Sequence, residues 1–436
     1  MVIKQKYLIE FQIYYLLIVE ALIDLLHFPD IIRYVLDVNA IVLIILALPK
    51  IRDMLNDKFF KGFNSYVFIY MIAIAGFSLI RRTPVGQILW AVRNNYFYIL
   101  FMLICAYTLK PKDLQRILKN IVFLQAFNVA CVLYEYLIQR QSGDNLGGMF
   151  GTEFGCNGYL NVYLAIITAY VIVGYANRKV SLFTVLMITL SSMAIAVLSE
   201  LKFYFFELVV IVILAITLSS LNAKNGMLVI VTVLAIFVGI QILSAVNPMS
   251  AELLRDFDSL NDYTKTSYDD QIIARGTPFS QINDYFFNGN LFYNLFGYGF
   301  GACESSETLR WANSAFANKY GYLQYRNLST SMNFIETGFI GLIAFVAIFV
   351  LVFVYAQNQK QKYENIRHAY VFTQVVSIIA IMNIWYNSTI RREIAYLTFF
   401  CLSAFIVYSR EKAREELKKN TADKPVKRSY FKNKRV

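Results

Sequence analysis

Apolar runs of about the length needed to cross a lipid bilayer recur along the whole sequence. A membrane helix needs ~18 or more consecutive apolar residues. The chain is 58% hydrophobic and only 16% charged, whereas a soluble domain carries about 25% charged residues. The runs are continuous and do not alternate between apolar and polar residues, as the strands of a membrane barrel do. The sequence therefore predicts an all-α fold, a polytopic bundle of membrane helices.

About twelve membrane spans can be counted, several of them short enough to be re-entrant or to merge with a neighbour. Their approximate limits are Tyr7–His27, Ile31–Leu48, Tyr66–Ile80, Tyr96–Leu109, Ile117–Ile138, Gly158–Tyr175, Val180–Leu198, Phe203–Leu221, Met227–Ala245, Phe334–Ala356, Ala369–Tyr386 and Ile394–Tyr408. A long polar stretch separates the ninth span from the tenth, although joints between packed helices are usually about 2–8 residues long. We therefore expect spans one to nine in 1–245, a large extracytoplasmic cap in 246–333, spans ten to twelve in 334–409 and a basic cytoplasmic tail in 410–436.

Basic residues set the expected orientation. With the N-terminus inside, 27 of the 41 basic residues fall in cytoplasmic joints and in the tail, as the positive-inside rule requires. Both termini are then cytoplasmic and the cap lies outside. The net charge of +12 follows from this topology, so we expect no nucleic acid partner. Five scattered Cys and two His form no ligand spacing, and no metal or cofactor is expected. Both Cys156 and Cys303 fall outside, which leaves a disulfide between them open.

The cations expected on the outer side are mostly arginine, whereas lysine predominates inside. The outer cations are Arg33, Arg81, Arg82, Arg93, Arg140, Lys202, Arg255, Lys265, Arg275, Arg310, Lys319, Arg326, Arg391 and Arg392. Topology needs only positive charge, but the planar guanidinium suits bidentate binding of phosphate or carboxylate. The pattern favours an anionic ligand at the outer face. The alternative is that the arginines pair with lipid head groups or with Glu200, Glu336 and Glu393.

Two outer segments carry candidate anion-binding residues. Arg81–Tyr96 contains Pro84 and Gly86, which break helices. It is interpreted as a re-entrant or interfacial turn that carries Arg93 towards the membrane with Arg82 beside it, or as an ordinary outer loop. The glycine-rich stretch Ser142–Asn161, with Asn157 near its end, has the composition of a phosphate cradle or of a simple loop.

Charged residues also stand at the edges of later spans. Ser199–Glu207 reads SELKFYFFE, and charges at membrane depth are costly and usually functional. Lys202 is expected to contact an anion balanced by Glu200 or Glu207, the alternative being a structural ion pair that closes a hairpin. Glu336 lies about one turn inside the tenth span.

The cap contains one candidate amphipathic segment and one glycine run. Arg275 opens ARGTPFSQINDYFF, which is expected to lie on the bilayer surface. Gly297 and Gly299 belong to LFGYGFGACESSE, whose spacing is not that of a dinucleotide fingerprint and rather indicates a close backbone turn. The cap has no HExxH, P-loop or GxSxG pattern, so hydrolase chemistry is not supported.

In this layout the chain resembles the bacterial O-antigen polymerase and ligase superfamily. The resemblance rests on the late outer loop, on FGTEFGCNGYLNVYL (Phe150–Leu164), on SELKFYFFE, and on the succession from Arg275 through LFGYGFG to FIETGFIGLI. It implies metal-independent glycosyl transfer, without a cofactor, at the outer leaflet of the bacterial cytoplasmic membrane. Donor and acceptor would be oligosaccharide repeat units linked to polyprenyl pyrophosphate, and a chain-length regulator and a flippase would be partners.

The resemblance also implies roles for the candidate residues. Arg275 and Lys202, then Arg93 and Arg82, would stabilise the leaving pyrophosphate, with Asn157, Gly297 and Gly299 among the substrate-binding residues. Glu336 or Glu200 would be the general base. Ligases of the superfamily are expected to carry a His before the tenth span, where this chain reads RNLSTSMNFIETG, which favours a polymerase. A ligase, a flippase or transporter, and a non-enzymatic assembly partner remain as alternatives.

Overall fold

The computed structural model describes residues 4–57, 60–153, 155–219, 224–248, 251–252, 272–306 and 309–422. Every regular element in these ranges is helical, which confirms the expected fold class. The longer helices are α1 (Gln5–Leu26), α2 (Val35–Ala47), α4 (Lys61–Ile80), α5 (Val85–Thr108), α6 (Pro111–Phe123), α7 (Gln125–Leu137), α8 (Asn157–Ala176), α9 (Leu182–Leu198), α10 (Lys202–Leu218), α11 (Lys224–Val246), α17 (Ser329–Lys362), α18 (Arg367–Tyr386) and α20 (Ala404–Ala422).

Short helices connect these elements. They are η1 (Asp30–Tyr34), η2 (Leu48–Lys50), α3 (Ile51–Leu55), η3 (Gly143–Asn145), η4 (Gly148–Phe150), α14 (Pro278–Ile282), η5 (Asn283–Phe287), α15 (Leu291–Phe296), η6 (Arg310–Ala312), α16 (Ala315–Tyr320), η7 (Gly321–Leu323), η8 (Tyr325–Asn327), η9 (Glu364–Ile366), η10 (Thr389–Arg391) and α19 (Ala395–Leu402).

Eight helical segments within the described ranges are long and apolar enough to cross a membrane. They are Asp30–Leu55, Lys61–Ile80, Val85–Thr108, Pro111–Leu137, Asn157–Ala176, Gly226–Ala245, Ser329–Lys362 and Arg367–Tyr386. Large apolar side chains such as Ile69, Ile72 and Val233 are exposed on the outside of the bundle, as expected for side chains that face the hydrocarbon of a lipid bilayer. The chain is therefore a helical membrane protein.

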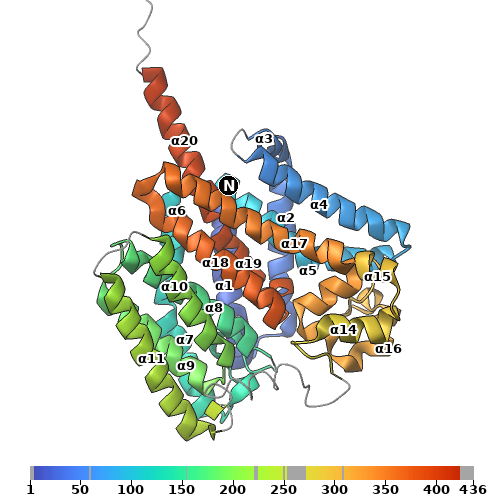
Figure 1. Ribbon diagram of the computed structural model, residues 1–436, viewed down its shortest axis with the longest axis horizontal. Coiled ribbons are helices and arrows are strands. Elements are labelled where there is room, and N and C mark those ends of the chain that lie inside the picture. Colours follow the sequence, from blue (N-terminus) through green and yellow to red (C-terminus); the bar gives the residue numbers. More distant parts are fainter. Residues whose placement is uncertain are drawn as a thin grey trace, which may run out of the picture.

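The bundle is built around α8, which is almost entirely buried. It packs against α9, α10 and α18, and α17 runs along α18. α17 is bent at Gly338, whose φ of 61° interrupts the helix. The short helices α14, α15 and α16 lie together on one side of the bundle, near the N-terminal part of α17 (Figure 1).

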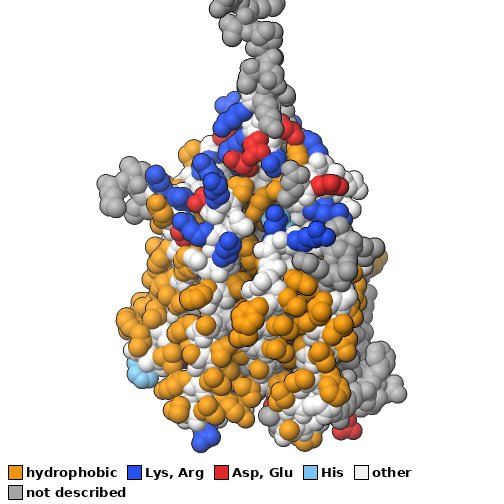
Figure 2. Space-filling model, turned by 90° about the vertical axis from the view of Figure 1, so that its left-hand side faces the viewer, with side chains coloured by type: hydrophobic (Ala, Val, Ile, Leu, Met, Phe, Trp, Pro, Cys, Tyr) orange, Lys and Arg blue, Asp and Glu red, His pale blue; other side chains and the backbone are white. Residues whose placement is uncertain are grey.

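Charge is distributed unevenly along the molecule. Figure 2 shows Lys and Arg side chains gathered at the end from which α20 projects, above a flank covered by hydrophobic side chains. At this end Lys360 and Arg367 both donate to the carbonyl of Leu218, the last residue of α10. The other end of α10, with Lys202, therefore lies at the opposite end of the bundle, which we call the cap end because α14–α16 are there (Figure 1).

Two expected details differ in the structure, and part of the predicted cap and tail lies outside the described residues. Arg81–Tyr96 is neither a re-entrant turn nor a loop beyond Pro84, because α5 begins at Val85 and continues regularly through Arg93. Cys156 and Cys303 are separate buried thiols, so no disulfide joins them. Other predicted cap and tail residues lie outside the described residues, namely Arg255, Asp256, Asp258, Asp262, Lys265, Asp269, Asp270, Glu307 and 423–436.

Candidate functional site

A polar cavity of about 850 Å³ lies at the cap end of the bundle. Its walls come from α1, η1, the loop before α8, the junction of α9 and α10, the cap and the connection between α18 and α19. The charged side chains that line it are Glu20, Arg33, Asp144, Glu153, Glu200, Lys202, Arg275, Arg392 and Glu393. We call it the polar cavity.

Part of the charge on its walls is neutralised internally by Arg33. The guanidinium of Arg33 binds Glu20 through two nitrogens, with an Nη2–Oε2 distance of 2.7 Å, and also reaches Glu153 at 2.5 Å. Two carboxylates therefore share one guanidinium. Fork-shaped pairs of this kind are both strong and directional, so this wall is preorganised.

Glu393 is held from behind the cavity wall by Arg93 on α5. Nη2 of Arg93 lies 2.6 Å from Oε1 of Glu393, while its Nε and Nη2 atoms bind the two carboxylate oxygens of Asp37. The hydroxyl of Tyr159 donates to Glu393 at 2.6 Å. Burial alone would raise the pKa of Glu393, but Arg93, Tyr159 and Arg392 outweigh it and hold that pKa at about 2. Glu393 is therefore a permanent anion at neutral pH.

Arg275 enters the polar cavity from the cap, and its guanidinium is stacked on an aromatic ring. Its guanidinium carbon lies 4.6 Å from the ring centre of Tyr386, and its Nε donates to the Tyr386 carbonyl at 3.1 Å. The Tyr386 ring is itself stacked on Phe203, with centroids 3.8 Å apart. Stacking of this kind orients a guanidinium. The arrangement presents a positioned cation to the cavity.

Glu200 and Lys202 enter the same cavity from the turn between α9 and α10. Glu200 has a φ of 52°, and the amide of Lys202 donates to the Glu200 carbonyl at 2.8 Å. The tight turn sends both side chains into the cavity. Across from them Nδ2 of Asn157, the first residue of α8, donates to Asp144 at 2.6 Å. Glu200 and Lys202 therefore share the polar cavity with Asn157 and Arg275, whereas Glu207 is buried in α10 and accepts from Asn161 and Asn383.

The glycine-rich loop before α8 does not offer the backbone amides of its middle part to a ligand. The amide of Gly148 donates to Glu135 at 2.7 Å, that of Met149 to Asn128, and that of Thr152 to Asp24 at 2.6 Å. The chain's own side chains thus occupy the positions where a phosphate would bind. The phosphate-cradle interpretation is wrong for residues 148–152, and only the flanking positions 142–144 and 155–158 line the polar cavity.

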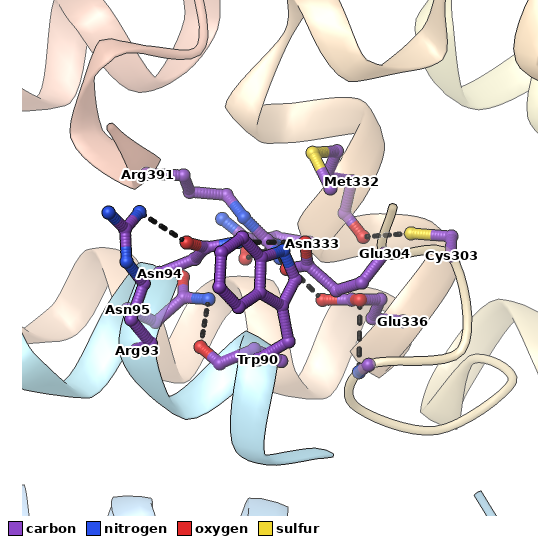
Figure 3. Close-up of polar contacts among 12 residues, drawn as sticks. Trp90, Arg93, Asn94, Asn95, Cys303, Glu304, Met332, Asn333, Glu336 and Arg391 are labelled. Carbon is purple, nitrogen blue, oxygen red and sulfur yellow. Dashed lines mark hydrogen bonds and ion pairs between the residues drawn. The ribbon is translucent and has the colours of Figure 1, made fainter. Parts of the chain in front are cut away.

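A second charged group, fully buried, joins the cap to the bundle beside the polar cavity (Figure 3). Nη2 of Arg391 lies 2.5 Å from Glu304 of the cap and 2.8 Å from Glu336 of α17, and Nη1 donates to Asn333. We call these four residues the Arg391 cluster. Burial alone would lower the pKa of Arg391, but Glu336 and Glu304 raise it above its ordinary value. Glu304 also accepts from Asn94 of α5 at 2.9 Å, so the cluster joins the cap, α5, α17 and the connection between α18 and α19.

Gly297 and Gly299 hold the cap loop against this cluster. Both have positive φ, 69° and 117°, and a Cβ on Gly297 would collide with the backbone of Glu336. The amide of Gly299 donates to the Glu336 carbonyl at 2.9 Å, and the amide of Gly301 donates to its Oε1. The expected close backbone turn is confirmed, and these glycines contact α17 rather than line the polar cavity.

The nine candidate residues thus fall into three places. Arg275, Glu200, Lys202 and Asn157 line the polar cavity, and Arg93 acts on it through Glu393. Glu336 is buried in the Arg391 cluster with Gly297 and Gly299 against it, and Arg82 is exposed in the turn between α4 and α5. The expected alternative, that outer arginines pair with Glu336 and Glu393, is thus correct for Arg391 and Arg93.

Sequence reasoning did not assign Arg33, Glu20, Glu153, Arg392 or Glu393 to the site. The signal available was the charge triplet Arg391–Arg392–Glu393 between two apolar runs, together with Glu20 inside the first run. Charges inside or next to spans are costly unless paired or functional. Which of them meet is decided by packing of α1, α5 and α18, which no local pattern records.

Comparison with known proteins adds no assignment. No protein-family model matches the chain, and no curated protein matches it significantly. Within the described ranges, no group of three or more His, Cys, Asp or Glu side chains is arranged to hold a metal ion. Function must be argued from the polar cavity itself.

Proposed function

We propose that the protein polymerises oligosaccharide repeat units linked to polyprenyl pyrophosphate, by glycosyl transfer at the outer leaflet of a bacterial cytoplasmic membrane. The observation that supports this most directly is the convergence of Arg275, Lys202 and Glu200 in one polar cavity at the cap end. Cations there suit a diphosphate, and carboxylate and amide groups suit sugar hydroxyls. The cavity has the size range of small-ligand sites.

The walls of the polar cavity carry charges of both signs. Four cations, Arg33, Lys202, Arg275 and Arg392, line it together with five carboxylates, Glu20, Asp144, Glu153, Glu200 and Glu393. Arg33 binds Glu20 and Glu153, and Arg93 and Tyr159 bind Glu393. The support for a diphosphate is therefore the grouping of Lys202 and Arg275 in one cavity, and not a surplus of positive charge.

In the proposed reaction a hydroxyl of the acceptor sugar attacks the anomeric carbon of the donor. The bond from that carbon to the pyrophosphate oxygen breaks, and the lipid pyrophosphate leaves with the electron pair. Arg275 and Lys202 stabilise the charge that develops on it, and Glu200 accepts the hydroxyl proton. Asn157, held by Asp144, orients a sugar hydroxyl.

The proposal includes the expected topology. It takes each of the twelve predicted spans as a crossing, with both termini cytoplasmic and the cap outside, in keeping with the Lys and Arg side chains that Figure 2 shows at the end from which α20 projects. A chain-length regulator and a flippase of the same pathway are the proposed partners. No cofactor is invoked in the reaction.

Two other functions differ from polymerisation in the acceptor or in the position of the charged site. A ligase would pass the same donor to an acceptor that is not a lipid-linked repeat unit. A flippase or transporter should have its charged groups near the bilayer midplane, whereas the polar cavity lies among helix ends and loops at one end of the bundle. The position of the cavity favours glycosyl transfer.

The test is polymerisation in vitro by purified protein supplied with lipid-linked repeat units. The proposal expects a ladder of products from the wild-type protein. Arg275→Lys should give only single repeats, because an ammonium group cannot reproduce the stacked, planar contact. The matched control is Arg310→Lys, an exposed cap arginine outside the polar cavity, which should keep the ladder. Wild-type protein without any ladder, or full activity of Arg275→Lys, would contradict the proposal.

A further inference from the structure

A second cavity, of about 320 Å³, lies at the basic end of the bundle from which α20 projects, away from the polar cavity. It is enclosed by α6, the end of α8, the start of α9 and the starts of α18 and α20. We call it the apolar slot. Its lining is mainly apolar, including Leu114, Leu118, Val122 and Val171. Nothing in the proposed glycosyl transfer uses this slot.

Aromatic rings form one wall of the apolar slot. Tyr170 and Phe372 meet edge to face with centroids 5.6 Å apart, and His368 and Tyr408 meet in the same way at 6.0 Å. All four line the slot. Flat ring faces and aliphatic side chains provide the surface that a hydrocarbon chain needs, and they offer few hydrogen-bonding groups to water.

Cations stand at the entrance of the slot. Lys119 and Lys179, both exposed, belong to its lining. Lys119 and Gln115 are also shared with an adjoining groove of about 260 Å³ whose other walls are Lys112, Arg116 and Asn120. Of these, Arg116 is bound to Glu10 and Asp113, which leaves the lysines as the main positive charge at the junction.

The spacing on α6 explains this arrangement. Leu114, Ile117, Leu118 and Ile121 are buried, whereas Lys112 and Lys119 are exposed. One face of the helix therefore packs into the bundle and the other is basic. Basic pockets between membrane helices are the usual sites for anionic lipid head groups.

We propose that the apolar slot and its lysine-rich entrance bind one anionic phospholipid, with an acyl chain in the slot and the phosphate between Lys119 and Lys179. Charge complementarity selects this occupant, because a zwitterionic lipid brings its own cation close to the lysines and a free phosphate leaves the slot empty. The site takes a structural lipid rather than the substrate. It is separate from the polar cavity, so it stands or falls independently of the glycosyl transfer.

The experiment is a lipid titration of the detergent-purified protein, read by native mass spectrometry. The probes are phosphatidylglycerol, phosphatidylcholine and glycerol 3-phosphate, the last being a head group without chains. The expected result is a bound phosphatidylglycerol that the other two probes do not match. The double variant Lys119→Gln with Lys179→Gln should bind it about thirtyfold more weakly, from the usual contribution of each surface cation.

Two further variants separate the parts of the site. Lys61→Gln removes one exposed cation at the start of α4, outside the slot, and should leave affinity unchanged. Thr184→Phe, at the slot wall, should block the chain and weaken binding while the lysines remain. Equal affinity of the double variant and wild type, equal binding of phosphatidylcholine, or equal binding of glycerol 3-phosphate would each overturn the proposal.

Discussion

The guanidinium of Arg93, on α5, lies 2.6 Å from the carboxylate of Glu393, which faces the polar cavity from the α18–α19 connection. The two residues are 300 positions apart in the chain, and their pair ties one wall of the cavity to the bundle. Asp37 on α2 binds the same guanidinium in a fork. The wall therefore depends on Arg93 remaining charged and on Glu393 remaining ionised.

Acid should weaken the protein through Glu393. The pKa of this carboxyl is about 2 in the folded protein against an ordinary 4.5. A lowered folded-state pKa contributes stability that is complete above about pH 4.5 and is lost as the pH falls towards 2. Between pH 7 and pH 3, the melting temperature in detergent should therefore fall less for Glu393→Gln than for wild type. Glu364→Gln, an exposed carboxyl at the other end, should behave like wild type; an equal fall in all three would refute the assignment.

Removal of Arg391 should be strongly destabilising. Arg391→Met leaves Glu304 and Glu336 buried without their partner, and breaking a buried pair in this way typically costs about 3–5 kcal/mol. A large drop in melting temperature is expected by fluorescence-monitored unfolding. The exposed Arg310→Met should show almost none.

The Arg391 cluster also permits a rescue. Adding Glu304→Gln and Glu336→Gln to Arg391→Met removes the uncompensated charges, so stability should recover in part. If the triple variant melts below the single variant, the penalty arises from packing and not from unpaired charge.

Eight of the twelve predicted spans overlap helices that are long and apolar enough to cross a membrane, because a continuous apolar run is visible in local composition alone. The turn at Gly297 and Gly299 was also predictable from local sequence, because glycine adopts positive φ at little cost in free energy. Glu200 and Lys202 of SELKFYFFE lie at a helix junction that lines the polar cavity, whereas Glu207 is buried inside α10.

Arg93 was misplaced because Pro84 and Gly86 were interpreted as helix breakers. Pro84 instead precedes the first residue of α5, a place where proline is compatible with a helix because its missing N–H is not needed there. Glu336 and Glu393 were expected as alternative partners of outer arginines, but the sequence does not say which arginine binds each of them. The partners of Arg33 were not predicted. These pairs form only through tertiary packing, and charge pairs leave no periodic pattern.

Gly338→Ala should destabilise the contact between the cap and α17. Gly338 has a φ of 61°, and a Cβ there would collide with the backbone of Leu295 and Phe296. Left-handed backbone costs about 1–2 kcal/mol for a residue with a side chain, and overpacking adds about 1–3 kcal/mol. Gly321→Ala is the matched control, because its φ is −60° and no atom lies within 4 Å of the added carbon. Comparable melting of both variants would show that the bend at Gly338 relaxes freely.

Of the two carboxylates expected as the base, Glu200 lines the polar cavity with Lys202 and Arg275, whereas Glu336 is buried in the Arg391 cluster and does not line the cavity. If the proposed polymerisation holds, Glu200→Gln should lower kcat by a factor of roughly 10²–10⁴ with little change in KM. Lys202→Gln should lower kcat as well, since it removes charge stabilisation of the leaving pyrophosphate. Asp284→Asn, an exposed cap carboxylate outside the cavity, is the control and should leave both constants unchanged. Initial rates with lipid-linked repeat units would decide the matter, because a rise in KM alone for Glu200→Gln would make Glu200 a binding residue and remove it as the base.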